Sequence, residues 1–470
     1  MSRGMLSIWV VAVFAEMALA GAGIAQVAQD LSRELAEARA VLATTEVKAA
    51  LTYVDGSDEE TVRDWLSICN AYGSQGDEIY RSRLIYKLFR IYGLEQVHID
   101  DARNVIGVRR GVGGGPTVVL NAHHDNVALW PKEQPIEAFV ADGRVWCPAA
   151  GDDLMGVTQL LSVLRAMNAG NIQTRGDVWF VTFTGEEVGS PGAEHFVRAN
   201  YPHNLDWRRG DILAQFHGGA GEGVTTGSEG YIHFAQLRVF VPIDFGRWRT
   251  DAVDALGPII TRINQELRDS RSVQVGRETS GGADLLQLNM PMVQGNAIHN
   301  GNSNEAWIRF DLRALTDERL QRAGRDIERI AAEVTRQMGE SFSYRYEVNM
   351  KLGATGVEGW DKANNAAARM AAAASQALYG TRPLIDPTSG CGDCRRAYMG
   401  GMPAMSFRGN VIDYGEGGRF EAQRAGGGLQ SQVRRKTSGH DVTESAEIIR
   451  IWAGIKQGLL FATAYAGLAQ

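Results

Sequence analysis

The sequence predicts an α/β protein with a mostly parallel sheet, into which a smaller α+β module is inserted. Short apolar runs rich in β-branched residues, such as 117–122, 178–183 and 212–216, alternate with segments of helical periodicity. From about residue 231 the predicted order changes to β-α-β-β-α-β, which is the order of a ferredoxin-like module. Because ligands gather at the carboxyl ends of parallel strands, the polar residues that follow the apolar runs are expected to form the site.

Composition is that of an ordinary globular protein with enough length for two domains. The chain has 470 residues, of which 44% are hydrophobic and 22% charged, and its net charge is -7. This balance provides no cationic surplus to neutralise phosphates, so we expect no nucleic acid partner.

The N-terminus has the pattern of a secretory signal. Arg3 precedes an apolar run over 5–19, and the small residues of 20–25 follow, so cleavage is expected after Ala25. Glu16 inside the apolar run leaves an uncleaved anchor as the alternative. Elsewhere no stretch approaches the roughly 20 apolar residues of a membrane span. We therefore expect a periplasmic or secreted protein that has no membrane contact once the signal is removed.

Three segments are expected after the signal peptide 1–25: a catalytic domain in two parts, 26–230 and 353–470, and an inserted lid domain, 231–352. Helices and strands were assigned to each from periodicity and turn residues. In the first part the expected helices are 26–50, 59–70, 76–92, 157–168 and 192–199, and the expected strands are 104–108, 117–122, 178–183 and 212–216. In the lid the strands are 234–241, 292–297, 306–312 and 344–350, with helices 251–268 and 317–338. The second part has helices 364–378 and 444–465, and a strand at 405–407 that returns to the parent sheet.

The chain has four cysteines, and two of them are close in sequence. In an oxidising compartment Cys391 and Cys394 could close a short disulfide. A zinc ribbon would need a second such pair, which the sequence lacks. A thioredoxin-like redox role for this pair is the alternative.

Two adjacent acids, Glu186 and Glu187, follow the apolar strand 178–183. Adjacent carboxylates can have separate functions, one binding a metal and the other moving a proton. Further metal-ligand residue types follow other predicted elements, and a mixed imidazole and carboxylate set suits zinc. The candidate ligands are His123, Asp152, Glu187, His217 and His440.

Each candidate has a possible role in the chemistry. Asp152 would bridge two metals, and Glu186 would accept the proton of the attacking water and return it to the leaving amine. Asp125 would receive a hydrogen bond from His123 and fix its tautomer. The alternatives are structural: Asp152 could be a helix N-cap, and strand alternation would point His124 away from His123, into packing.

In this order the motifs resemble those of the co-catalytic zinc exopeptidases and amidohydrolases, a family that includes peptidase T, carboxypeptidase G, aminoacylase and succinyl-diaminopimelate desuccinylase. The similar segments are the His-x-Asp of 123–125, the glycine-containing approach of 142–152, the Glu-Glu pair, the turn of 390–395 and His440. The resemblance implies a phosphorylase/hydrolase-like zinc-exopeptidase fold that binds two Zn²⁺ ions. It also implies a small peptide or N-acyl amino acid substrate contacted by Asn300, and a possible homodimer formed through the lid.

Three departures from the family pattern bear on activity. His217 stands where the family usually has Asp or Glu, and Leu154-Met155 replaces a common Lys. The lid also lacks the family's His that stabilises the oxyanion. Arg247, Arg249 or His299 could take that role instead.

The leading hypothesis is an exported dizinc hydrolase that cleaves a peptide or N-acyl amide bond, with Glu186 as general base. The alternative is a catalytically silent binding protein that keeps the fold, which the His217 substitution favours and the intact Glu186-Glu187 pair opposes. Lid arginines, among them Arg313, are candidates to hold a substrate carboxylate.

Overall fold

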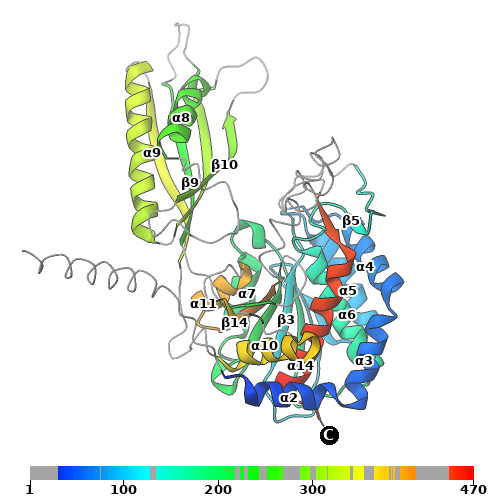
Figure 1. The fold of residues 1–470 in the computed structure, drawn as a ribbon. Helices are drawn as coiled ribbons and strands as arrows, with labels where there is room; N and C mark the ends of the chain where they lie inside the picture. The colour runs from blue at the N-terminus through cyan, green and yellow to red at the C-terminus, as the bar shows by residue number, and fades with distance from the viewer. Residues whose placement is uncertain are drawn as a thin grey trace, which may run out of the picture.

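The fold consists of two units, a larger one at the lower right of Figure 1 and a smaller one above it. The computed structural model describes residues 30–74, 76–126, 134–217, 223–226, 231–242, 251–267, 286–296, 303–314, 316–338, 342–353, 365–380, 383, 385–386, 392–408 and 444–469.

The larger unit is built on an eight-stranded sheet of order β1-β2-β6-β3-β7-β14-β8-β13. Its centre, from β6 to β14, is parallel. β1 and β2 pair antiparallel to their neighbours, whereas β8 is antiparallel to β14 and parallel to β13. This confirms the predicted mainly parallel sheet and the return of the segment near residue 405 to it. The strands are β1 (Glu95–Ile99), β2 (Val105–Arg109), β3 (Val118–His123), β6 (Val178–Phe183), β7 (Ile212–Phe216), β8 (Gly223–Thr225), β13 (Ile385–Asp386) and β14 (Ala404–Arg408).

Helices cover both faces of this sheet, so the central strands are buried on both sides. On β6, Phe180 packs in the core beneath α6 and α14, whereas Phe183 packs in a second core with Phe196 of α7 and Tyr398 of α11. Figure 1 shows α7 and α11 on the side opposite α3, α5 and α6. The helices are α2 (Ser32–Leu42), α3 (Thr45–Asp55), α4 (Asp58–Asn70), α5 (Ile79–Ile91), α6 (Leu154–Ala169), α7 (Pro191–Asn200), α10 (Ala366–Tyr379), α11 (Gly392–Met399) and α14 (Ile451–Ala466).

A small three-stranded sheet, β4-β5-β15, lies beside the main one. A tight turn joins β4 (Phe139–Ala141) to β5 (Arg144–Trp146), and both of its central residues, Asp142 and Gly143, have positive φ. The predicted helix 444–465 is wrong at its start, because β15 (Ser445–Glu447) pairs with β5. Arg144 reinforces that pairing through hydrogen bonds to Ser445 and Glu447, so a long-range contact prevails over helical periodicity there.

The smaller unit has the predicted β-α-β-β-α-β order. Its strands are β9 (Tyr231–Phe240), β10 (Leu286–Gly295), β11 (Glu305–Ala314) and β12 (Ser343–Leu352), and its helices are α8 (Ala252–Glu266) and α9 (Asp317–Met338). The sheet is antiparallel throughout, with order β10-β11-β9-β12. Alternate residues of β11 are buried against α8 and α9, which cover one face and give this unit a core of its own.

Cys69 at the end of α4 forms a disulfide with Cys147, with 6.0 Å between the Cα atoms. Sequence reasoning did not predict this pairing. Cys394 is also disulfide-bonded, and its predicted partner, Cys391, lies outside the described residues. Among the helices of the described segments, none is long and apolar enough to cross a bilayer.

Candidate active site

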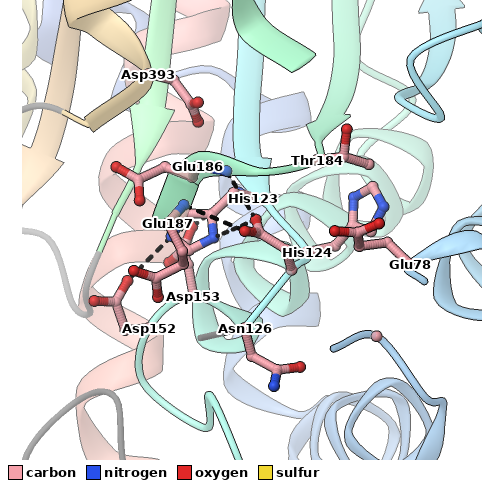
Figure 2. A network of polar contacts seen from close by, with 12 residues as sticks. Glu78, His123, His124, Asn126, Asp152, Asp153, Thr184, Glu186, Glu187 and Asp393 are labelled. Atoms are coloured by element: carbon pink, nitrogen blue, oxygen red, sulfur yellow. Dashed lines mark hydrogen bonds and ion pairs between the residues drawn. The ribbon is translucent and has the colours of Figure 1, made fainter. Parts of the chain in front are cut away.

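His123 is the last residue of β3, and its fully buried ring lies between two carboxylates (Figure 2). Nδ1 lies 3.2 Å from Oδ1 of Asp125, and Nε2 lies 3.1 Å from Oδ1 of Asp152. Burial alone would lower the pKa of His123, but the hydrogen bonds to Asp125 and Asp152 outweigh burial and raise the pKa well above its usual value. The Asp125 contact leaves Nε2 directed at the centre of the site.

Glu186 and Glu187 form a single 3₁₀ turn at the end of β6. The turn is flanked by Gly185 and Gly189, whose φ values of 68° and 94° are rarely adopted by other residues. The backbone N–H groups of Glu186 and Glu187 donate to the two oxygens of Asp125, at 3.1 and 3.2 Å. A single buried carboxylate therefore fixes both the imidazole from β3 and the turn after β6.

His217 follows β7, which is parallel to β3, and its ring centroid lies 5.5 Å from that of His123. Its Nε2 is 3.6 Å from Oδ1 of Asp152 and 3.8 Å from Oε1 of Glu186. Ligand atoms of His123, Asp152 and Glu187 lie within 4.8 Å of one another, and so do those of His123, Glu186 and His217.

The structure thus brings together six of the eight residues singled out in the sequence: His123, Asp125, Asp152, Glu186, Glu187 and His217. The remaining two, His440 and Asn300, lie outside the described residues, as do Arg247, Arg249 and His299.

His124 points away from the site, as strand alternation predicts, and lies near Thr184 and Glu78 in Figure 2. It is fully buried, and its Nε2 lies 2.9 Å from the Ser82 hydroxyl. Burial lowers the pKa of His124 to about 3, so the ring is neutral. It therefore has a packing role.

Sequence reasoning missed Arg81, whose hydrogen bonds hold the segment that follows β3. Its fully buried guanidinium donates to the carbonyl oxygen of His124 at 2.5 Å and to Oδ1 of Asn126 at 3.2 Å. Burial lowers the pKa of Arg81 to about 10, although Asp125 and Glu78 oppose the shift. Gly73 makes room for it, since a Cβ there would lie 2.3 Å from the guanidinium.

The N-terminal end of α11 borders Glu186 directly. A Cβ at Gly392 would lie 1.7 Å from Oε1 of Glu186, so any larger residue there would displace the Glu186 carboxylate. The adjacent Asp393 is fully buried, and Gln215 donates to its Oδ2 at 2.8 Å. Burial and nearby carboxylates raise the pKa of Asp393 to about 7.

Glu186 itself is held in an environment that favours a bound proton. Burial raises its pKa well above the usual value, and the charges of Glu187, Asp393 and Asp152 add to the shift against the opposing effect of His123. A carboxylate with a raised pKa, next to a set of metal-ligand residues, is suited to accept and return a proton.

Residues 119–422, more than half of the chain, match the model of peptidase family M20/M25/M40. The chain belongs to this family. Membership confirms the resemblance identified in the sequence, and it supports a hydrolytic enzyme of the metallopeptidase class. The M20 family is metal-dependent, which agrees with the donor set gathered around His123.

Two individual relatives are similar to this chain over shorter segments. The chain is 29% identical over 197 residues to a cysteinylglycine-S-conjugate dipeptidase of Corynebacterium striatum, covering 40% of this chain and 41% of that protein. It is 31% identical over 108 residues to an N-formyl-4-amino-5-aminomethyl-2-methylpyrimidine deformylase of Halalkalibacterium halodurans, covering 22% of this chain and 25% of that one. This M20 chain thus spans well under half of either relative.

The fold is shared over nearly the full length with solved structures. Human carnosine dipeptidase 1 superimposes with a TM-score of 0.66 at 12% identity, covering 89% of this chain and 98% of that one. At that level of identity the likeness concerns the fold alone.

Proposed function

We propose that this M20 protein is an exported dizinc hydrolase that cleaves a peptide or N-acyl amide bond in a small substrate with a free carboxylate. The observation that carries the proposal is the convergence of His123, Asp152, Glu187 and His217 at the ends of three parallel strands and a helix start, with Glu186 beside them.

The donor set fits zinc. Two imidazoles and two carboxylates are the ligand types that Zn²⁺ prefers, and Asp152 lies between the two imidazoles, where a bridging ligand is needed. His440 would complete the set, by resemblance to the family. When bound, the two ions would supply Lewis acidity toward the scissile carbonyl and would acidify a water molecule.

The protein's own residues supply the proton transfer. Glu186 is 14% exposed and faces the donor set, and its pKa is raised by burial, so it can take a proton from water and deliver it to the leaving nitrogen. Asp125 would remain ionised, because hydrogen bonding to His123 and nearby charges lower its pKa despite complete burial.

Two arginines beside Glu186 support a carboxylate-bearing substrate. Arg395 of α11 has a buried Nη1 that makes no hydrogen bond within the described residues. Burial and the repulsion of Arg313 lower the pKa of Arg395 to about 10, while Glu186 opposes the shift. Arg313 of β11 is held by Asp311 at 2.9 Å and keeps 42% of its side chain exposed. A substrate carboxylate would relieve this repulsion and satisfy the buried donor.

The first experiment measures the bound metal and the rate of substrate hydrolysis on the same protein preparation. The wild-type protein is expected to bind two Zn²⁺ ions and to hydrolyse members of a panel of dipeptides and N-acyl amino acids. Glu186→Gln should keep the metal and lose roughly 10²–10⁴-fold in kcat. Wild-type protein that binds no metal, or a variant with full activity, would refute the enzymatic proposal. Metal binding without any hydrolysis would favour the silent binding protein instead.

The second experiment tests the substrate carboxylate. Arg395→Gln should lower kcat/KM by roughly 10²-fold on an N-acyl amino acid and have little effect on the corresponding amide, because a charged hydrogen bond is lost only with the acid. The matched control is Arg198→Gln, at a side chain that is 78% exposed. Equal losses on both substrates would contradict carboxylate recognition by Arg395.

Export and dimerisation complete the proposal. The signal pattern of residues 1–25 is supported by the Cys69–Cys147 disulfide, since such bonds persist mainly in oxidising compartments. N-terminal sequencing of the protein recovered from outside the cytoplasm tests the cleavage after Ala25. The smaller unit is proposed as the lid and dimer interface, and Asn300 as a substrate contact, by family resemblance. Light scattering would report the dimer.

A further inference from the structure

Asp152 lies at the end of a loop, residues 147–153, here called the Asp152 loop. The loop connects β5 with α6, and its carboxylate must reach both His123 and His217. No regular secondary structure orients Asp152 itself, so the position of its carboxylate depends on what holds the backbone of the loop.

Glu444 makes that contact. Its side chain is buried, with 3% of the residue exposed, and Oε1 accepts hydrogen bonds from the N–H groups of both Gly151 and Asp152, at 2.7 and 2.8 Å. Gly151 permits the approach, since a Cβ there would lie 3.1 Å from Oε1.

Glu444 is in turn anchored to the same loop through its backbone. Its carbonyl oxygen accepts from the N–H of Cys147 at 3.1 Å, and the next three residues form β15, which pairs with β5. On the other side α4 holds the loop through the Cys69–Cys147 disulfide and through Trp65, whose Nε1 donates to the carbonyl oxygen of Ala150 at 3.1 Å. The α4 contacts reach Ala150 and Cys147, whereas the Glu444 carboxylate reaches the N–H of Asp152 itself.

We propose that Glu444 is a positioning residue for the metal site, which fixes the Asp152 backbone so that its carboxylate lies between His123 and His217. Its Oε1 acts on Asp152 through the N–H groups of Gly151 and Asp152. The inference rests on the proposed function, in that the site must bind metal. This role explains why the buried acid Glu444 lies beside a second acid, Asp152. The N–H groups of Gly151 and Asp152 both need an acceptor, and the Glu444 carboxylate provides one.

The test measures Zn²⁺ affinity of the metal-free full chain by competition with a chromophoric chelator. Glu444→Ala should weaken binding about 10–100-fold, the range seen when a residue supporting a metal ligand is removed. Glu444→Gln keeps an oxygen that can accept both hydrogen bonds, so its affinity should stay within about threefold of wild type. If Gln is as poor as Ala, the charge and not the hydrogen-bond geometry matters, and the positioning role is wrong.

A matched control separates positioning from general stability. Asp211 is also a buried carboxylate that accepts backbone N–H bonds, from Thr117 at 2.8 Å and Asp206 at 2.9 Å, but it lies at the start of β7, whereas His217 follows its end. Asp211→Ala should lower the unfolding midpoint without changing Zn²⁺ affinity. Equal affinity losses in the two Ala variants, or none in Glu444→Ala, would overturn the proposal. Wild-type protein that binds no Zn²⁺ would instead overturn the proposed function.

Discussion

Removing the Cys69–Cys147 disulfide should destabilise the larger unit by several kcal/mol. The two cysteines are 78 residues apart in sequence. In the chain-entropy model, closing a loop of that length lowers the entropy of the unfolded chain by an amount equivalent to about 4.5 kcal/mol at 25 °C. Both cysteines are buried, so alanine is the suitable replacement because it introduces no polar group into the core.

The assay is urea unfolding of Cys69→Ala/Cys147→Ala and of the wild-type protein, followed by tertiary circular dichroism. Each is measured with and without a thiol reductant. The variant should lose about 4–5 kcal/mol of unfolding free energy. With the reductant present, the wild-type protein and the variant should have the same stability, and the loss that the reductant causes in the variant reports the Cys394 disulfide. A loss below about 1 kcal/mol would refute the reasoning, since the linked segment would then be ordered in the unfolded chain anyway.

Three further predictions concern single residues. Asp125→Asn should weaken Zn²⁺ binding about 10–100-fold, measured by chelator competition, because His123 and the Glu186-Glu187 turn lose their shared acceptor. Gly392→Ala should lower kcat by about 10²-fold while zinc content is retained, since the new Cβ would displace the Glu186 carboxylate; Gly56→Ala, which has only ordinary contacts, is the control, and unchanged kcat would contradict the role of Gly392. Burial lowers the pKa of His233 despite its hydrogen bond to Asp317, so the folded state binds this proton less readily than the unfolded state. Stability from His233 is therefore present above pH ~6.5 and lost as pH falls through the interval below it, and thermal unfolding from pH 7 to 5 should show a flatter profile in His233→Gln.

Local pattern predicted most of the elements that deliver site residues. The bounds of α9 and β7 agree with the predicted 317–338 and 212–216, because a long amphipathic repeat and a short apolar run are both local signals. The acids after β6 were found for the same reason: they end a buried strand, and the fold rule for parallel sheets states where such residues gather.

The features that the sequence did not reveal are contacts between residues that are far apart in the chain. The Cys69–Cys147 pair carries no spacing signal, since pairing among four cysteines cannot be deduced from sequence. Arg81 looks like an ordinary helical arginine, and only the fold buries it under His124, 43 residues away. Local periodicity predicts Glu444 as the first residue of a helix, whereas its side chain accepts hydrogen bonds from N–H groups more than 290 residues earlier. Each is a long-range contact whose signal is absent from any local window.

The position of β14 in the main sheet determines when this protein can fold. β7, which leads to His217, pairs with β3 on one side and with β14 on the other, and β14 is synthesised only after the whole smaller unit. The last helix, α14, then packs against α2, α6 and α10. While the chain is being made, β7 therefore presents an unpaired edge, and the core beneath it stays open until almost the final residues have emerged. The main sheet and core of the larger unit are therefore completed only by the C-terminal part of the chain, after the smaller unit has been made.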